Sequence, residues 1–304
     1  MIAQLSSSVF PGMEECRAPI SGGGLRYLVG GSGPPLILVH GIAASSFSFR
    51  LNCAELMREF RVFLPDLLSV GYTDRNPALD VSLRGTATRL REFMDQVGLK
   101  RANILGSSHG GSVVMELAAL NPQGVECLVL VSPANPFAVG YHSVVQFYLS
   151  ALGRIFIRLA PFMPGFAWDY GIGRMYADPS GMVPGSGIGY ARSLRTKGAV
   201  PHIRSCLRTF KNDIEGLKTH LPVLAELPTL LIWGDRDPVV ELESAYQLQR
   251  ALAAELVVMQ NVGHLPYEES PANFNRAVSD WLKSQSRDRH QQNATVCGPT
   301  DHMT

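Results

Sequence analysis

The chain has 304 residues, and its 27 lysines and arginines nearly balance 26 aspartates and glutamates, for a formal net charge of +1 at pH 7. With no basic stripe, we expect nucleic acid not to be a partner. The length suffices for one large domain with an insertion and a sizeable core. Its five cysteines form no C-x-x-C pair, so we expect neither a zinc site nor a disulfide framework, and we predict a reduced, cytoplasmic setting.

The sequence pattern predicts no strand before residue 25. Residues 1–10 lack a basic stretch followed by a long apolar core, so they do not resemble a secretion signal. No stretch of the chain reaches the ~20 apolar residues that span a bilayer. We interpret residues 1–23 as a loop-like extension, followed by strands at 25–29, 36–39 and 60–64.

The rest of the chain predicts strands that alternate with helices. Ser82 is a plausible N-cap for a helix that Gly98 closes. Further strands are predicted at 125–131, 227–233 and 255–259, and Ser-Pro at 270–271 opens a final helix. This alternation predicts an α/β fold with a mostly parallel, doubly wound sheet and helices on both faces.

The pentapeptide G-S-S-H-G centred on Ser108 is the most informative motif. It follows a short apolar run at 102–105 and precedes a helical run at 111–120. In this strand–turn–helix context, a G-x-S-x-G motif holds the serine in strained geometry with its hydroxyl exposed. Gly106 and Gly110 provide the small side chains needed where strand and helix approach closely. The motif predicts Ser108 as a nucleophile.

Two later strands supply the partners that such a serine needs. A serine hydroxyl requires a base to take its proton and a carboxylate to orient that base. The strand at 227–233 runs into Asp235 and Asp237, and the strand at 255–259 leads to His264. Open α/β sheets place their sites at the carboxyl ends of the strands, so these side chains are expected to meet there. The pattern alone leaves both aspartates open.

Residues 24–284 resemble the α/β-hydrolase superfamily, specifically its lipase, esterase and C–C hydrolase branch. The H-G-I run at His40 resembles the family's oxyanion loop, and the pentapeptide resembles its nucleophile elbow. Gly234, with Asp237 three positions later, resembles the acid turn, and G-H-L-P around His264 resembles the terminal histidine segment. The four motifs occur in the family's order. The resemblance implies an α/β-hydrolase fold and favours Asp237 as the acid.

The resemblance also implies roles for these residues. Ser108, Asp237 and His264 would form the catalytic triad. The backbone N–H groups of Ile42 and His109 would form the oxyanion hole. No cofactor or metal is implied. A serine rather than a carboxylate as nucleophile argues against the haloalkane dehalogenase and epoxide hydrolase branches.

Substrate-binding residues are less well marked by the sequence. His40 is expected to brace the oxyanion loop rather than to react. We predict that it contacts the substrate together with Ser107, Phe147, Trp168 and Leu265.

The alternation of strands and helices breaks for some 90 residues after residue 132. Helix-like pieces rich in aromatic residues and methionine occur there, separated by Pro-Gly and Gly-x-Gly breaks. A structureless loop of this length is improbable, so a helical cap over the carboxyl edge of the sheet is predicted. The predicted organisation is an extension at 1–23, the core at 24–136 and 211–284, the cap at 137–210 and a disordered tail at 285–304.

These features predict a hydrolase of small-molecule esters with an apolar acyl or aromatic part. A C–C hydrolase of a vinylogous diketo acid is the nearer alternative, with Arg174, Arg192 or Arg195 of the cap holding the substrate carboxylate. Ser107 counts against it, because those enzymes tend to have asparagine there. A non-enzymatic receptor that keeps the pocket is the remoter alternative. The oligomeric state is not predicted.

Overall fold

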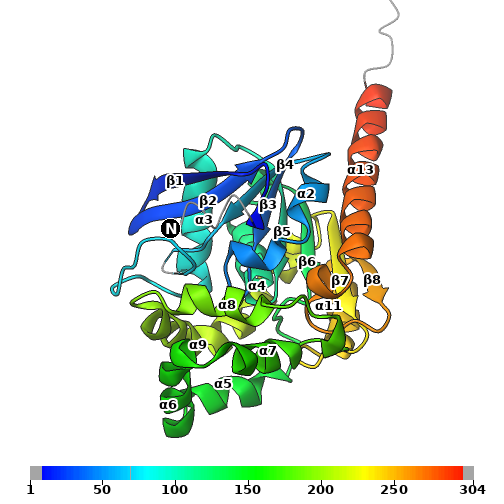
Figure 1. Ribbon diagram of the computed structural model, residues 1–304. Coiled ribbons are helices and arrows are strands. Elements are labelled where there is room, and N and C mark those ends of the chain that lie inside the picture. Colours follow the sequence, from blue (N-terminus) through cyan, green and yellow to red (C-terminus); the bar gives the residue numbers. More distant parts are fainter. Residues whose placement is uncertain (1–8, 69, 297–304) are drawn as a thin grey trace, which may run out of the picture.

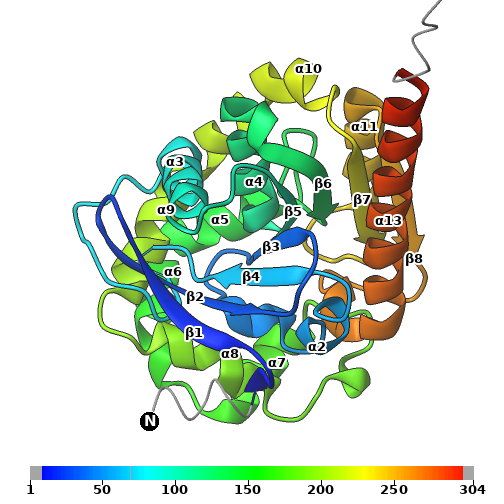
Figure 2. The same cartoon turned by 90° about the horizontal axis from the view of Figure 1, so that it is seen from above.

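The computed structural model describes residues 9–68 and 70–296 of the chain. Within them, eight strands form one sheet in the order β1-β2-β4-β3-β5-β6-β7-β8 (Figures 1 and 2). β1 and β2 run antiparallel to their neighbours, and the other strands are parallel, which confirms the predicted mostly parallel sheet. The strands are β1 (Glu14–Ile20), β2 (Gly23–Gly30), β3 (Pro35–Val39), β4 (Arg61–Pro65), β5 (Ala102–Ser107), β6 (Val125–Val131), β7 (Thr229–Gly234) and β8 (Glu255–Met259).

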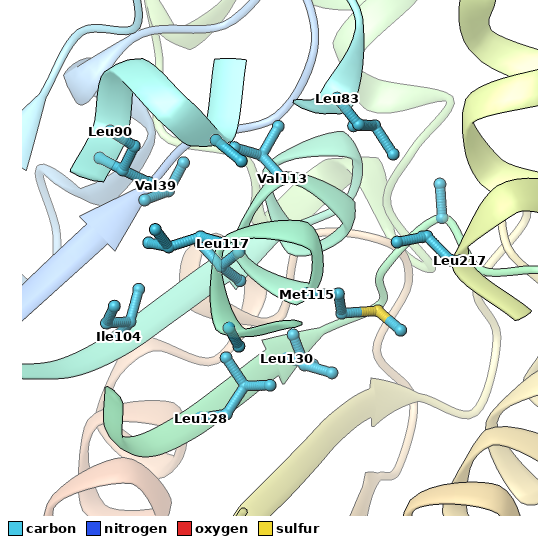
Figure 3. Packing of buried hydrophobic residues seen from close by; sticks show 14 of the residues in the cluster. Val39, Leu83, Leu90, Ile104, Val113, Met115, Leu117, Leu128, Leu130 and Leu217 are labelled. Atoms are coloured by element: carbon cyan, nitrogen blue, oxygen red, sulfur yellow. The ribbon is translucent and has the colours of Figure 1, made fainter. Parts of the chain in front are cut away.

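Helices cover both faces of the sheet because the central strands are apolar on both sides. Ile37 and Val39 of β3 pack with α3, α4 and α11, whereas Leu36 and Leu38 pack with α2 and α13. Figure 3 shows Val113 of α4 in the first of these two clusters. The core helices are α2 (Cys53–Leu56), α3 (Leu83–Gln96), α4 (His109–Leu120), α10 (Leu221–Leu224), α11 (Leu242–Leu252), α12 (Pro266–Glu269) and α13 (Pro271–Val296).

The predicted start of α3 is confirmed. Ser82 is its N-cap, and the Ser82 Oγ accepts a hydrogen bond of 3.1 Å from the backbone N–H of Gly85. Gly98, just past the end of the helix, has a φ of +73°, in the left-handed region that glycine adopts readily.

The segment between β6 and β7 contains helices and no strand. Figure 1 shows α5 to α9 gathered at one end of the sheet, and we call the segment from α5 to α9 the cap. The helix α9 crosses the boundary predicted at residue 210, because Phe210 and Ile214 on it are buried in the core cluster. These helices are α5 (Tyr141–Leu149), α6 (Ala151–Leu159), α7 (Gly165–Gly173), α8 (Ser186–Leu194) and α9 (Ala199–Gly216).

Among the described residues, no single helix is long and apolar enough to cross a membrane. Only α5 combined with Ala151–Phe162 would have the necessary length and composition, and these two parts are bent by 86° relative to each other.

Both ends of the chain differ from the prediction. Residues 14–20 of the predicted extension form β1, which pairs with β2 along its whole length. The tail predicted to be disordered from residue 285 is helical to residue 296, as the last part of α13. Arg289 on this helix donates a hydrogen bond of 3.0 Å to the backbone oxygen of Glu126 and forms an ion pair with its carboxylate. The predicted tail beyond residue 296 lies outside the described residues.

Candidate active site

Ser108 lies on a strained turn between β5 and α4. Its φ of +53° and ψ of −124° belong to a region that side chains other than glycine rarely adopt. A Cβ atom on Gly106 would lie 2.5 Å from the backbone oxygen of Gly110, and one on Gly110 would collide with the backbone oxygen of His40. Both glycines are therefore required by the close approach of the strand, the helix and the loop after β3.

His264 and Asp237 form a buried, directly bonded pair. His264 follows β8, and its Nδ1–H donates to the two carboxylate oxygens of Asp237 at 2.8 and 3.1 Å. The exposed fractions of the two side chains are 4% and 0%. The carboxylate is held by the backbone N–H groups of Val239 and Val240, at 2.8 and 2.9 Å from its Oδ1. This arrangement directs the Nε2 of His264 away from the acid and leaves it available as a base.

The other candidate aspartate has a different role. The Oδ1 of Asp235 accepts a hydrogen bond of 3.2 Å from the backbone N–H of Val262, two residues before His264. Asp235 thereby ties the turn after β7 to the loop after β8.

The Ser108 hydroxyl makes no hydrogen bond to any described residue. Catalytic hydrogen bonds are often long without substrate and tighten when the complex forms. Ser108, Asp237 and His264 all follow the carboxyl ends of parallel strands in one half of the sheet, on β5, β7 and β8.

The loop after β3 lies against the nucleophile elbow. A Cβ atom on Gly41 would lie 3.3 Å from the Cβ of Ser108, so glycine permits this approach. Within the described residues, the backbone N–H groups of Ile42 and His109 have no hydrogen-bond acceptor. Two unpaired amides beside a strained serine are the donors that an oxyanion hole needs.

His40 holds this loop through hydrogen bonds of its side chain. Its Nδ1–H donates to the backbone oxygen of Gly41 at 2.8 Å, and its Nε2 accepts from the backbone N–H of Leu67 at 3.2 Å. Burial lowers the pKa of His40, which keeps the ring neutral. Both ring nitrogens are therefore engaged with backbone groups.

Glu269 links the histidine loop to the cap. Its Oε1 accepts from the backbone N–H groups of Gly263 at 2.9 Å and Leu265 at 3.4 Å, and its Oε2 accepts from Ala177 N–H at 2.8 Å. His264 N–H in turn donates to the backbone oxygen of Met175 at 2.7 Å. The loop that carries His264 is thus held to the segment before α8 by the Glu269 carboxylate and by one backbone–backbone hydrogen bond.

A second glutamate forms a buried network that sequence reasoning did not find. Glu268 pairs with both terminal nitrogens of Arg50, at 2.7 and 2.9 Å, and accepts from the hydroxyls of Tyr176 and Tyr190. Burial raises the pKa of both tyrosines, so their hydroxyls remain protonated donors. The two tyrosines come from the segment between β6 and β7, and no motif in the sequence marks them as partners of Glu268.

A cavity of about 20 Å³ lies between the oxyanion loop and α9. Such a volume holds a water or two. The cavity is lined by His40, Gly41, Ile42, Ala43, Leu67, Leu68, Val70, Thr86, His109, His202, Ile203 and Cys206.

The cavity contains one of the five residues predicted to contact the substrate, His40. Ser107 is fully buried within β5, and Leu265 is buried in the core. Phe147 packs against other aromatic rings of α5 and α6, and the indole N–H of Trp168 donates to the backbone oxygen of Ala160. These four lie outside the cavity lining.

Three residues of α9 line the cavity without having been marked by the sequence: His202, Ile203 and Cys206. His202 and Cys206 lie one turn apart on α9, and the His202 Nε2 is 3.5 Å from the Cys206 Sγ. Burial lowers the pKa of His202 to about 4. Burial also lowers the pKa of His109 to about 4, and its ring stacks on Phe210 with the centroids 5.7 Å apart. At neutral pH these cavity histidines are uncharged.

The comparisons with known proteins identify the family. The sequence profile of the alpha/beta hydrolase family matches residues 36–277. The chain belongs to the alpha/beta hydrolase family. Lipase 3 of Moraxella sp. (strain TA144) is 26% identical over 257 residues, which cover 83% of this chain and 79% of the lipase. The predicted superfamily is confirmed.

C–C hydrolases of this family are similarly related. The 2-hydroxymuconate semialdehyde hydrolase of Pseudomonas sp. (strain CF600) is 26% identical over 261 residues, covering 83% of this chain and 88% of that protein. The structure of 2-hydroxy-6-oxo-6-phenylhexa-2,4-dienoate hydrolase from Rhodococcus sp. strain RHA1 has a TM-score of 0.75 at 21% identity, covering 89% of this chain and 99% of that chain. At this identity, the structural likeness concerns the fold.

Proposed function

We propose that this alpha/beta hydrolase is a serine esterase for small carboxylic esters with an apolar acyl or aromatic group. The observation that carries the proposal is the buried bond between His264 Nδ1 and Asp237, on the same strand edge as the strained Ser108. An imidazole held in one tautomer by a buried carboxylate is the base that a serine nucleophile needs.

The proposed reaction begins with attack of the Ser108 Oγ on the ester carbonyl carbon while the His264 Nε2 takes the hydroxyl proton. The carbonyl oxygen becomes an oxyanion, which accepts hydrogen bonds from the N–H groups of Ile42 and His109. Collapse of this intermediate breaks the bond to the leaving oxygen, and His264 returns the proton to it. The alcohol departs, and the acyl group remains on Ser108.

Water then completes the cycle. His264 takes a proton from a water molecule that attacks the acyl carbon, and the second tetrahedral intermediate expels the Ser108 oxygen. That oxygen recovers the proton from His264, and the carboxylic acid is released. Asp237 stays ionised throughout and stabilises the imidazolium that forms at each step.

The chemistry of the cavity supports an apolar substrate. Its walls are mainly aliphatic, contributed by residues such as Leu67, Leu68 and Ile203. Of its titratable groups, the three histidines have pKa values lowered by burial, and burial raises the pKa of the Cys206 thiol to about 12. Neutral walls favour an uncharged ester over a substrate that carries a carboxylate.

The C–C hydrolase alternative draws support from the sequence relative named 2-hydroxymuconate semialdehyde hydrolase. It requires a cation near the substrate carboxylate. The cap arginines considered for this role, Arg174, Arg192 and Arg195, are exposed, and no arginine lines the cavity within the described residues. The ester reading is therefore the better supported of the two.

A substrate panel tests the proposal. Wild-type protein and Ser108→Ala are assayed with p-nitrophenyl esters from acetate to palmitate, together with a 2-hydroxy-6-oxo-dienoate. We expect turnover of medium-chain or aryl esters that Ser108→Ala abolishes. Preferred turnover of the dienoate would favour the C–C hydrolase. Tight binding of these compounds without turnover would favour a receptor and contradict the proposal.

A further inference from the structure

Exposed large apolar side chains are concentrated in one part of the cap. Of the fourteen such side chains in the described residues, twelve lie between Val139 and Val183. Phe162 is 83% exposed and Phe166 is 76% exposed. A concentration of exposed apolar side chains is typical of a surface that meets a partner or a membrane.

The helix α6 shows how this surface is built. Its buried side consists of Gly153 and Ile157. Leu152, Ile155 and Leu159 are exposed and are spaced at i, i+3 and i+7, so they form one stripe along the helix. We call Leu152, Ile155, Leu159, Phe162 and Phe166 the cap face.

Only positive charge accompanies the cap face. Residues 137–168 contain two charged side chains, Arg154 and Arg158, and no aspartate or glutamate. The two arginines are one turn apart on α6, so they project from the same side of the helix, beside the apolar stripe. Both are exposed, and within the described residues neither forms an ion pair.

Two arginines of α9 enlarge this positive region. Burial and then the nearby charges of Arg208, Arg158 and Arg154 lower the pKa of Arg204. Arg204 therefore lies near each of the other three guanidinium groups, and within the described residues none of the four is paired with a carboxylate. A cluster of unpaired cations next to an apolar stripe complements a surface that is both anionic and apolar.

The cap face also lies where a flat surface can reach it. Figure 1 shows α5 and α6 at the end of the molecule furthest from the sheet. The opposite side of α6 faces inward, where Ile157 belongs to a buried cluster with Ile203 and Leu207 of α9. One side of this short helix therefore faces solvent while the other is buried against the rest of the cap.

We propose that the cap face docks on the surface of an anionic phospholipid bilayer. The apolar stripe enters the boundary between headgroups and acyl chains, and the four arginines contact lipid phosphates. The helix lies in the plane of the interface and does not span the bilayer. This inference goes beyond the proposed esterase and does not depend on it, because binding is measured without turnover.

The test is flotation of the full chain with vesicles. Phosphatidylcholine vesicles with and without phosphatidylglycerol are compared at low and high salt. We expect binding to vesicles that contain phosphatidylglycerol, weakened by salt because the arginines are exposed. Wild-type protein that fails to float with anionic vesicles at low salt would overturn the proposal.

Two pairs of variants sharpen the test. Arg154→Glu/Arg158→Glu should lower the partition coefficient at least about tenfold, whereas Arg84→Glu/Arg91→Glu, with the same charge change on exposed positions of α3, should lower it much less. Leu152→Ser/Ile155→Ser/Leu159→Ser should abolish binding, and the exposed control Val223→Ser/Tyr246→Ser should retain it. Equal losses in variants and controls would contradict a specific cap face.

Folding and self-association are checked separately. Circular dichroism and thermal unfolding show whether each variant folds, independently of any esterase activity. Size-exclusion chromatography with light scattering reports the oligomeric state. A wild-type dimer that the leucine and isoleucine substitutions convert to monomer, with no vesicle binding, would assign the cap face to a second copy of the chain and overturn docking on lipid.

Discussion

The strand ends of β5, β7 and β8 and the outer helices of the cap differ in which side chains are buried and which charges are paired. At the ends of β7 and β8, the side chains of the candidate site are buried and bonded, as Asp237 is to His264 and to two backbone amides. In α5 and α6, apolar side chains are exposed, and within the described residues the two arginines of α6 have no carboxylate partner. The first region has a geometry that fits the proposed reaction, and the second has a composition that fits the proposed docking surface.

The largest expected contrast concerns Ser108. Ser108→Ala should lower kcat for ester cleavage on the order of 10⁶-fold, because the triad acts as a unit. The cap variant Leu152→Ser/Ile155→Ser/Leu159→Ser should leave the hydrolysis of a short, water-soluble ester almost unchanged. Steady-state kinetics on both folded variants measure this contrast. Comparable losses of kcat in the two variants would mean that the cap face also contributes to catalysis.

Within the first region, the two aspartates provide a matched pair. Asp237→Asn should cost roughly 10⁴-fold in kcat, since an amide cannot hold the required histidine tautomer. Within the described residues, the only hydrogen bond of the Asp235 side chain is to the backbone N–H of Val262, so Asp235→Asn should cost far less. The acid assignment is wrong if Asp235→Asn proves the more damaging substitution.

His109, which lies where the cap packs on the core, should make the stability of the protein depend on pH. Burial against the cap lowers the pKa of His109 in the folded protein to about 4, below its ordinary value of 6.5. Above pH 6.5 both folded and unfolded states are neutral at this site, so it contributes nothing. Between pH 6.5 and 4 the unfolded state binds a proton that the folded state does not, and stability falls.

His109→Gln removes this proton uptake while keeping the backbone N–H. At pH 5, the free energy of unfolding of the wild type should have fallen by about 2 kcal/mol through this group alone. Urea unfolding at pH 7 and pH 5 should therefore show a smaller difference between the two pH values for the variant. An identical difference for both proteins would mean that His109 is protonated in the folded state.

The smallest effect concerns the acyl chain. Each methylene buried under the cap should raise kcat/KM by up to about fourfold, equivalent to ~0.8 kcal/mol, until the pocket is full. Ile203→Ala enlarges the cavity from the cap side and should shift the optimum to longer chains, whereas the exposed Val223→Ala should not. If kcat/KM does not change with acyl-chain length, the cap does not select the substrate.

The candidate triad could be predicted from the sequence because each of its members follows a strand in a short local motif. The strained φ of Ser108 and the bond from His264 to Asp237 depend on a few neighbouring residues and on the order of strands. The N-cap at Ser82 is likewise a local feature. Such features can be predicted because they depend on residues only a few positions apart in the chain.

The cavity lining could not be predicted because it depends on how distant helices pack. His202 and Cys206 reach the cavity only because α9 lies over the oxyanion loop, and the sequence pattern of α9 does not encode that placement. The aromatic residues Phe147 and Trp168 are typical of a pocket but contribute to the cap's own packing. The helical residues 285–296 were missed because they are polar, although Arg289 anchors the helix to Glu126.

Covalent labelling by an alkyl fluorophosphonate tests the central claim most directly, because such a reagent phosphonylates a serine only when a base activates it. Intact-mass and peptide mass spectrometry should find a single adduct, on Ser108. Labelling should be absent in Ser108→Ala and strongly slowed in Asp237→Asn, while Asp235→Asn should label like the wild type. An adduct on another residue, or undiminished labelling of Ser108→Ala, would contradict the assignment of Ser108 as the nucleophile.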